Sequence, residues 1–244
     1  MKIVCFGDSL TRGVSYVKGR LRIVKENYPN LLQQLFSENN KEVSVVNKGV
    51  FNDNSELLLN RLEKDVIKER PNYVIIEIGG NDCNFNWHEV AEKPWEKHQA
   101  IVPMNQYLDN LKSIITNIKQ HDIIPVVATL PPLDPVRYYK NISEKYSPAI
   151  SHWISEVGGI DYWHGLYNRN LNKLAEEYNI LKVDVRSALK KAGNLMDFIS
   201  DDGIHLTAEG YKILSHEIYR NIEKWSAEER SEERRVGKEC PLLC

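Results

Sequence analysis

Five short apolar runs, each rich in β-branched residues, constrain the fold of this chain more than any other feature. They are Lys2–Phe6, Val43–Asn47, Tyr73–Ile78, Pro125–Leu130 and Ile180–Asp184. Apolar residues are nearly continuous in each run, which is typical of strands buried on both faces of a parallel sheet. With 244 residues, the chain is long enough to bury such a sheet in a substantial core.

Stretches of helical periodicity separate these runs. Apolar residues recur at helical spacing at Leu31, Leu32, Leu35 and Phe36, at Leu58, Leu59, Leu62 and Val66, at Leu108, Leu111, Ile115 and Ile118, at Leu166, Leu171, Leu174 and Tyr178, and at Tyr211, Leu214, Ile218, Ile222 and Trp225. Ser55 and Thr207 are candidate N-caps of the second and the last helix. Strands alternating with helices predict a three-layer α/β/α sandwich with a five-stranded parallel sheet, in one domain over residues 1–225.

Two long segments rich in aromatic residues, Phe85–Pro103 and Leu133–Gly159, interrupt this alternation. We expect them to be loops that form the walls or lid of a pocket, because long loops in compact domains are usually functional or disordered. Their aromatic content argues against disorder. Trp87, Tyr138 and Trp153 are the candidate pocket residues. The alternative is that these rings pack on the flank of the domain.

The motif Gly7-Asp8-Ser9-Leu10 directly follows the first apolar run. A serine at the carboxyl end of a strand lies at the edge of the sheet where open α/β proteins bind ligands. Judged alone, such a serine fits a helix N-cap better than a nucleophile. The motif is not the G-x-S-x-G elbow of α/β-hydrolases, because Thr11 stands where the second glycine is required.

Glycine-containing motifs also follow the second and third runs, as Asn47-Lys48-Gly49 and Gly79-Gly80-Asn81-Asp82. Each alone is an ordinary turn signal. If the strands have the flavodoxin-like order 2-1-3-4-5, however, Gly49, Ser9 and Asn81 converge on one part of the sheet edge. A nucleophile flanked by a backbone N–H and a side-chain amide is the layout used for acyl transfer.

The fourth motif, Asp202-Gly203-Ile204-His205, precedes the last helix. A histidine can serve as a general base when a carboxylate fixes its tautomer, and Asp202 lies three residues before His205. The one rival pair with the same spacing, Asp161 and His164, begins a helical pattern and does not follow a strand.

In order and spacing, the four motifs resemble the SGNH (GDSL) hydrolase family, whose name lists its Ser, Gly, Asn and His. The resemblance extends from Lys2 to about Trp225. It implies that Ser9 is the nucleophile and His205 the general base. It also implies that Asp202 orients His205, since the D-x-x-H spacing of the family selects Asp202 over the adjacent Asp201.

The same resemblance implies an oxyanion hole made of the Ser9 N–H, the Gly49 N–H and the Asn81 side chain. Asp8 and Asp82 belong to the matching motifs and are expected to support the site. The long aromatic segments depart from the pattern, because small members of the family often have shorter connections there. This departure leaves the substrate class open.

The resemblance implies hydrolysis of a small carboxylic ester through an acyl-enzyme, with no metal and no cofactor. The aromatic rings favour a carbohydrate deacetylase slightly, and the alternative is a lysophospholipase or thioesterase that holds an acyl chain. Cys83, beside Asn81, is expected to be a small buried residue and not a thiol nucleophile. A remote alternative is a non-catalytic flavodoxin-like protein that binds a phosphate at Gly7–Ser9, which leaves His205 without a role.

The charge balance and the chain ends add further expectations. A net charge of −2 and a pI near 6.4 argue against a nucleic-acid partner. No apolar run approaches the roughly 18 residues that a membrane span needs, and no signal peptide precedes Gly7, so we expect a cytoplasmic protein. The sequence does not indicate an oligomeric state.

Residues 226–244 differ in character from the rest of the chain. From Ala227 onward, charged residues without any apolar period predict a disordered tail. The string from Arg230 to Cys240 also resembles the translation of a sequencing adapter. We therefore expect the natural protein to end near Trp225.

Overall fold

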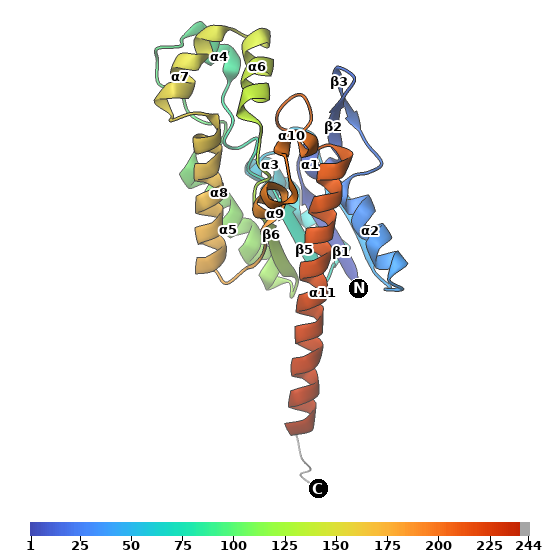
Figure 1. Ribbon diagram of the computed structural model, residues 1–244. Helices are drawn as coiled ribbons and strands as arrows, with labels where there is room; N and C mark the ends of the chain where they lie inside the picture. Colours follow the sequence, from blue (N-terminus) through green and yellow to red (C-terminus); the bar gives the residue numbers. More distant parts are fainter. Residues whose placement is uncertain (240–244) are drawn as a thin grey trace.

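The protein, in a computed structural model that describes residues 1–239, is built around a parallel sheet of five strands (Figure 1). The strands are β1 (Lys2–Gly7), β4 (Ser44–Gly49), β5 (Tyr73–Glu77), β6 (Ile124–Ala128) and β7 (Leu181–Val183). They lie in the order β4-β1-β5-β6-β7, and each neighbouring pair is parallel. The five predicted strands and their order are therefore confirmed.

The alternation of side chains along the strands divides the core into two layers. In β1, Val4 and Phe6 belong to one core, whereas Ile3 and Cys5 belong to the other. The first core lies under α3 (Ser55–Asp65), α5 (Met104–Gln120) and α8 (Ile160–Glu177), and the second under α2 (Tyr28–Glu38), α9 (Val185–Ala192) and α11 (Ala208–Glu239). Because helices cover both faces of the sheet, its strands are apolar on both sides. The predicted three-layer sandwich is confirmed.

The caps of two helices were predicted, one of them wrongly. The side chain of Asn54, not that of Ser55, caps α3 by accepting a hydrogen bond from the Leu57 N–H at 3.0 Å. Ser55 is instead the first residue of the helix. Thr207 caps α11 as predicted, since its Oγ1 accepts a hydrogen bond from the Gly210 N–H at 3.2 Å.

The two segments predicted to be long loops fold into short helices. These are α4 (Trp87–Glu92), α6 (Pro135–Lys145) and α7 (Ser151–Glu156), with the 3-10 helix η2 (Pro148–Ile150) before α7. The loop prediction is wrong because each segment carries its own helix start. The side chains of Asn86 and Asp134 cap α4 and α6, and Pro135 suits the first position of α6. We call these elements the cap, and Figure 1 shows them together beyond the carboxyl ends of the strands.

A β-hairpin that the sequence did not reveal follows α1 (Ser9–Arg12). It pairs β2 (Val14–Val17) with β3 (Arg20–Ile23) in antiparallel orientation. The two residues of its turn, Lys18 and Gly19, both have positive φ, 52° and 77°, as a type I′ turn requires. Figure 1 shows the hairpin projecting at the same end of the molecule as the cap. The remaining elements are η1 (Ile67–Glu69) and α10 (Leu195–Phe198).

The last helix, α11, continues past Trp225 to Glu239 (Figure 1). α11 thus includes residues 227–239 of the predicted tail, a segment rich in strong helix formers that extends a helix already nucleated. Residues 240–244, which belong to the same predicted tail, lie outside the described residues. Among the helices of residues 1–239, none is long and apolar enough to cross a membrane.

Candidate active site

Ser9 is held at the carboxyl end of β1 as the first residue of α1. The helix cap is not Ser9 itself but Asp8, whose carboxylate accepts a hydrogen bond from the Leu10 N–H at 2.9 Å. The hydroxyl of Ser9 is therefore not used for capping. This resolves the local ambiguity of the motif, because the two roles fall on adjacent residues.

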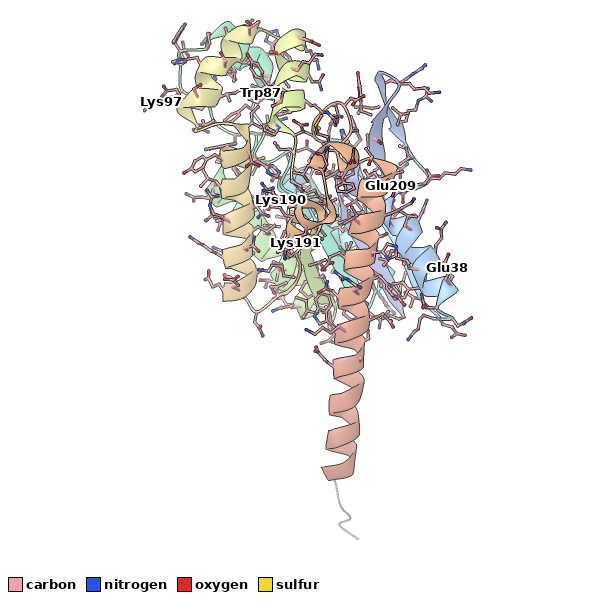
Figure 2. All side chains as sticks on the ribbon, viewed as in Figure 1. Glu38, Trp87, Lys97, Lys190, Lys191 and Glu209 are labelled. Atoms are coloured by element: carbon pink, nitrogen blue, oxygen red, sulfur yellow. The ribbon has the colours of Figure 1, made fainter. Side chains whose placement is uncertain are left out.

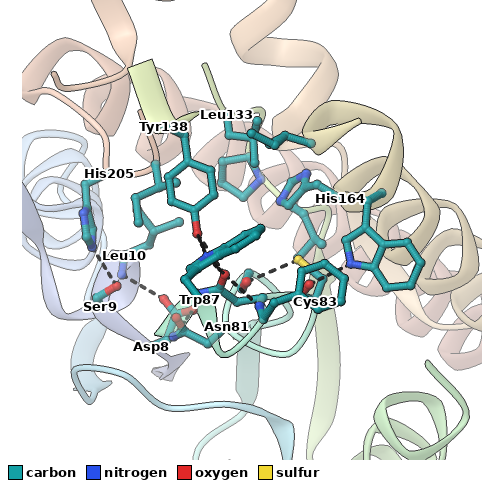
Figure 3. Close-up of a pocket in the computed structure, with 18 of the residues that line it drawn as sticks. Asp8, Ser9, Leu10, Asn81, Cys83, Trp87, Leu133, Tyr138, His164 and His205 are labelled. Atoms are coloured by element: carbon teal, nitrogen blue, oxygen red, sulfur yellow. Dashed lines mark hydrogen bonds between the residues drawn. The ribbon is translucent and has the colours of Figure 1, made fainter. Parts of the chain in front are cut away.

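The hydroxyl of Ser9 begins a line of three buried side chains, of which Figure 3 labels Ser9 and His205. Its Oγ lies 3.0 Å from His205 Nε2, and His205 Nδ1 lies 2.6 Å from Asp202 Oδ2. The exposed fractions of the three residues are 8%, 5% and 3%. Since an ionised carboxylate can only accept, Nδ1 carries the proton and Nε2 is free to accept the Ser9 proton.

The Asp202 carboxylate is fixed by more than its contact with His205. Its Oδ1 accepts hydrogen bonds from Ser200 Oγ at 2.9 Å and from the backbone N–H groups of Ile204 and His205 at 3.2 and 3.1 Å. Burial acts to raise the pKa of Asp202, but these hydrogen bonds and the nearby His205 outweigh it, so the pKa lies below its ordinary value. The carboxylate is thus ionised and immobilised.

Asn81 reaches the same edge from the end of β5. Its Nδ2 donates to the carbonyl oxygen of Asp53 at 2.7 Å and, over 3.5 Å, to Asp8 Oδ2. Burial raises the pKa of Asp8 to about 7. Asp82, fully buried, accepts a hydrogen bond from the Ser55 N–H at 2.9 Å and thereby ties this loop to α3. The two aspartates expected to support the site do contact it or its neighbours.

The structure does not bring Gly49 to the pocket, which contradicts the predicted role. Its N–H donates to Asn47 Oδ1 at 2.8 Å, and its Cα faces α1. A Cβ at this position would lie 2.1 Å from the backbone nitrogen of Arg12. The glycine is therefore explained by the close approach of β4 to α1, and not by donation to a ligand.

The segment after β4 that does contact Asn81 is the turn Val50–Asp53. The Asp53 N–H donates to the Val50 carbonyl at 3.3 Å, and Asn52 has a φ of 63°. A positive φ at the third position defines a type II turn, which favours Gly and, among other residues, Asn. The pair Asn52-Asp53 is the sequence signal that could have pointed to this turn.

A cavity of about 90 Å³ opens beside Ser9 (Figure 3). Its wall is mostly apolar and comes partly from the cap and α8; the apolar residues are Leu10, Phe85, Trp87, Leu130, Leu133, Tyr138, Ile154, Val157, Ile160, Trp163 and Ile204. Trp87 and Tyr138 line it as predicted. Trp153 does not, because its ring packs edge-on against Phe85, at 5.6 Å between centroids.

The polar atoms of this wall are bonded to one another. Trp87 Nε1 donates to Asn84 Oδ1 at 2.7 Å and to the Tyr138 hydroxyl at 2.9 Å, and that hydroxyl donates to Asn84 Oδ1 at 2.8 Å. Trp163 Nε1 donates to the Cys83 carbonyl at 2.7 Å. The aromatic wall therefore presents apolar faces to the cavity.

The competing candidates for catalysis are accounted for otherwise. Asp161 pairs with Arg186 at 3.0 Å and not with His164, whose Nδ1 lies 3.1 Å from the same guanidinium. Burial and the charge of Arg186 lower the pKa of His164 to about 3. Burial raises the pKa of the Cys83 thiol far above neutrality, so it is protonated and not a nucleophile.

The sheet order gives a three-layer sandwich, and a hydroxyl, an imidazole and a carboxylate lie in line at its edge. These features together define an SGNH-type hydrolase. The profile of the GDSL-like Lipase/Acylhydrolase family matches residues 5–213, and the chain belongs to that family. Two of the curated relatives that it matches are named as a GDSL esterase/lipase and an acetylxylan esterase.

Two relatives illustrate the similarity. The chain is 26% identical over 219 residues to an acetylxylan esterase of Geobacillus stearothermophilus, covering 89% of this chain and 83% of the relative. It is 24% identical over 226 residues to an isoamyl acetate-hydrolyzing esterase of Saccharomyces cerevisiae, covering 91% and 86%. Among solved structures, a lipase/acylhydrolase of Enterococcus faecalis matches with a TM-score of 0.67 at 23% identity, covering 91% of this chain and 94% of the other.

Proposed function

We propose that the protein hydrolyses carboxylic esters through an acyl-enzyme formed on Ser9. The observation that supports this most directly is the buried line from Ser9 Oγ through His205 to Asp202, with distances of 3.0 and 2.6 Å. Ser9 attacks the ester carbonyl while His205 accepts its proton. His205 then protonates the leaving alkoxide, and water attacks the acyl-enzyme with His205 again as the base. Asp202 holds the tautomer and stabilises the imidazolium.

The oxyanion of the tetrahedral intermediate is placed between the Ser9 backbone N–H and the Asn81 amide. One N–H of that amide is fixed on the Asp53 carbonyl at 2.7 Å, and the other, whose contact with Asp8 Oδ2 is long at 3.5 Å, is the one that we assign to the oxyanion. We assign the third donor to the turn Val50–Asp53 instead of Gly49, because this turn is the part of the segment that contacts Asn81. Preorganised donors of this kind account for much of the rate enhancement in acyl transfer.

The cavity favours an ester with short, apolar substituents. At about 90 Å³ it holds roughly six to nine water-sized atoms, taking about 10–15 Å³ for each. Its aromatic N–H and O–H groups are already bonded within the wall, so few remain to bind sugar hydroxyls. The names of the two relatives above both refer to acetyl esters, one of a polysaccharide and one of an apolar alcohol. For this chain we favour the short ester of an apolar alcohol over a carbohydrate deacetylase or a long-chain lysophospholipase.

A substrate panel tests this proposal. Wild type and Ser9→Ala are assayed on p-nitrophenyl acetate, butyrate and octanoate, on isoamyl acetate and on an acetylated xylo-oligosaccharide. We expect acetate and butyrate to exceed octanoate in kcat/KM, isoamyl acetate to exceed the sugar ester, and Ser9→Ala to lose several powers of ten. Near-normal turnover by Ser9→Ala refutes the mechanism, whereas a preference for octanoate or the sugar ester refutes only the substrate class.

A further inference from the structure

The hairpin β2–β3 carries an excess of positive charge that nothing in the fold balances. From Leu10 to Lys25 the sequence holds five basic residues and no acidic one. They are Arg12, Lys18, Arg20, Arg22 and Lys25, and all five side chains are exposed. Within the described part of the chain, none of them takes part in a salt bridge. Lys18, Arg20 and Arg22 lie in the hairpin itself, whereas Arg12 and Lys25 flank it, and the acidic Glu26 directly follows Lys25.

The same hairpin exposes apolar side chains beside these charges. Leu21 and Ile23, two residues apart on β3, are 44% and 60% exposed, and they lie on one face of the ribbon. Val50 and Phe51, in the turn after β4, are 41% and 46% exposed. These four residues border an open groove of about 530 Å³, and Arg12 and Arg22 also line it. An exposed apolar patch of this kind marks an interaction surface.

Hydrogen bonds fix the position of this surface relative to the active site. The Tyr16 N–H donates to Ser200 Oγ at 3.3 Å, and Ser200 Oγ donates to Asp202. The Tyr211 hydroxyl donates to the Val14 carbonyl at 2.6 Å and so anchors the base of the hairpin to α11. The hairpin also follows α1, which carries Ser9, directly in the chain. The surface and the catalytic residues therefore lie at the same end of the molecule (Figure 1).

We propose that the hairpin and the turn after β4 form a docking surface for anionic lipid. Exposed apolar residues with arginines at their border fit an interface where acyl chains lie beneath negatively charged headgroups. A neutral protein partner would leave the five cations without counter-charges, which argues for an anionic occupant. Docking here brings the carboxyl edge of the sheet, with Ser9, close to esters dissolved in the lipid.

Vesicle flotation of the full chain tests this proposal independently of its activity. Vesicles of phosphatidylcholine alone are compared with vesicles containing 30% phosphatidylglycerol, at 50 and 500 mM NaCl. We expect binding to the anionic vesicles only, and loss of that binding at high salt. Each basic residue near such a surface contributes about fivefold to binding, so Arg20→Glu with Arg22→Glu should weaken it by about 25-fold or more.

A matched control separates local charge from net charge. Lys173→Glu with Lys191→Glu makes the same change of charge at exposed positions on α8 and α9 (Lys191 is labelled in Figure 2). This control should retain most of the binding, and Leu21→Ser with Ile23→Ser should lose it despite an unchanged charge. Circular dichroism and turnover of p-nitrophenyl acetate report whether each variant is folded.

Three outcomes would overturn the proposal. Equal binding to neutral and anionic vesicles would remove the role of the cations, and equal loss in the control would show a net-charge effect. The third outcome is that wild type does not bind vesicles but dimerises with rising concentration in sedimentation velocity. If Leu21→Ser with Ile23→Ser abolishes that dimerisation, the surface binds a second copy of the chain. None of these outcomes bears on the esterase mechanism, which Ser9→Ala tests.

Discussion

Replacing Asp202 by asparagine tests the proposed triad at its most constrained residue. Asp202 Oδ1 accepts hydrogen bonds from Ser200 Oγ and from the N–H groups of Ile204 and His205, so three donors require an oxygen at this position. In Asp202→Asn the amide oxygen takes that place. The NH₂ group then occupies the site of Oδ2, 2.6 Å from His205 Nδ1.

The consequence is a reversed tautomer of His205. Facing a donor, Nδ1 has to accept, so the ring proton moves to Nε2, which lies 3.0 Å from Ser9 Oγ. A protonated Nε2 cannot accept the proton of Ser9. We expect kcat to fall by about 10⁴, or about 5 kcal/mol in the barrier, as the same substitution does in a serine protease triad.

The assay is the initial rate on p-nitrophenyl acetate from pH 7 to 9, with thermal melting to show that the variant is folded. Asp201→Asn is the matched control, because the neighbouring Asp201 side chain is 82% exposed and lies 3.9 Å from Arg137 as its nearest charge partner. It should stay within about twofold of wild type. An Asp202→Asn variant within tenfold of wild type, or an equal loss in Asp201→Asn, would refute the assignment.

Three further predictions concern the oxyanion hole, Gly49 and the buried acids. Asn81→Ala should lower kcat by about 10²–10³ with little change in melting temperature, the loss expected of one oxyanion donor; a change below threefold would remove Asn81 from the hole. Gly49→Ala should destabilise the fold by about 1–3 kcal/mol in urea unfolding, because its Cβ would lie 2.1 Å from the Arg12 nitrogen; an unchanged midpoint would contradict this packing role. Burial raises the pKa values of Glu77 and Asp8, to about 7 for Asp8. Each group therefore contributes its full stabilisation only below the unfolded-state pKa, near 4. That stabilisation is lost as the pH rises through the folded-state pKa. Glu77→Gln should therefore gain stability relative to wild type at pH 8.5 compared with pH 5, and a constant difference in urea midpoint would show that Glu77 does not titrate in this range.

The sheet and the catalytic line were predictable because both depend on constraints that are local in the sequence. A strand buried on both faces is apolar at nearly every position, and β5, with all five residues buried and Glu77 as its one charged residue, carries that pattern visibly. The strand order then brought Ser9 and Asn81 to one edge. The three-residue spacing of Asp202 and His205 was sufficient because the pair bonds within its own loop.

The role of Gly49 could not be predicted for the opposite reason. A glycine is required both where a backbone N–H faces a ligand and where two backbones touch, and the sequence does not distinguish these cases. Only the packing of β4 against α1 decides between them. The hairpin could not be predicted either. Its turn is Lys18-Gly19 instead of the usual Asn-Gly, and β3 is exposed at every position, so it lacks the apolar pattern of a buried strand.

The proposed catalytic residues and the pocket residues lie on parts of the chain with different constraints. Ser9 and Asn81 follow strands whose register the whole sheet fixes, so their geometry is common to any chain with this fold. Part of the wall of the cavity comes from the cap, where Trp87 and Tyr138 bond to each other and to Asn84, which precedes α4. The hydrogen bonds of this network run among its own side chains and not to the sheet. Membership of the family therefore carries the chemistry of ester hydrolysis, whereas the choice of ester has to be argued from the cap.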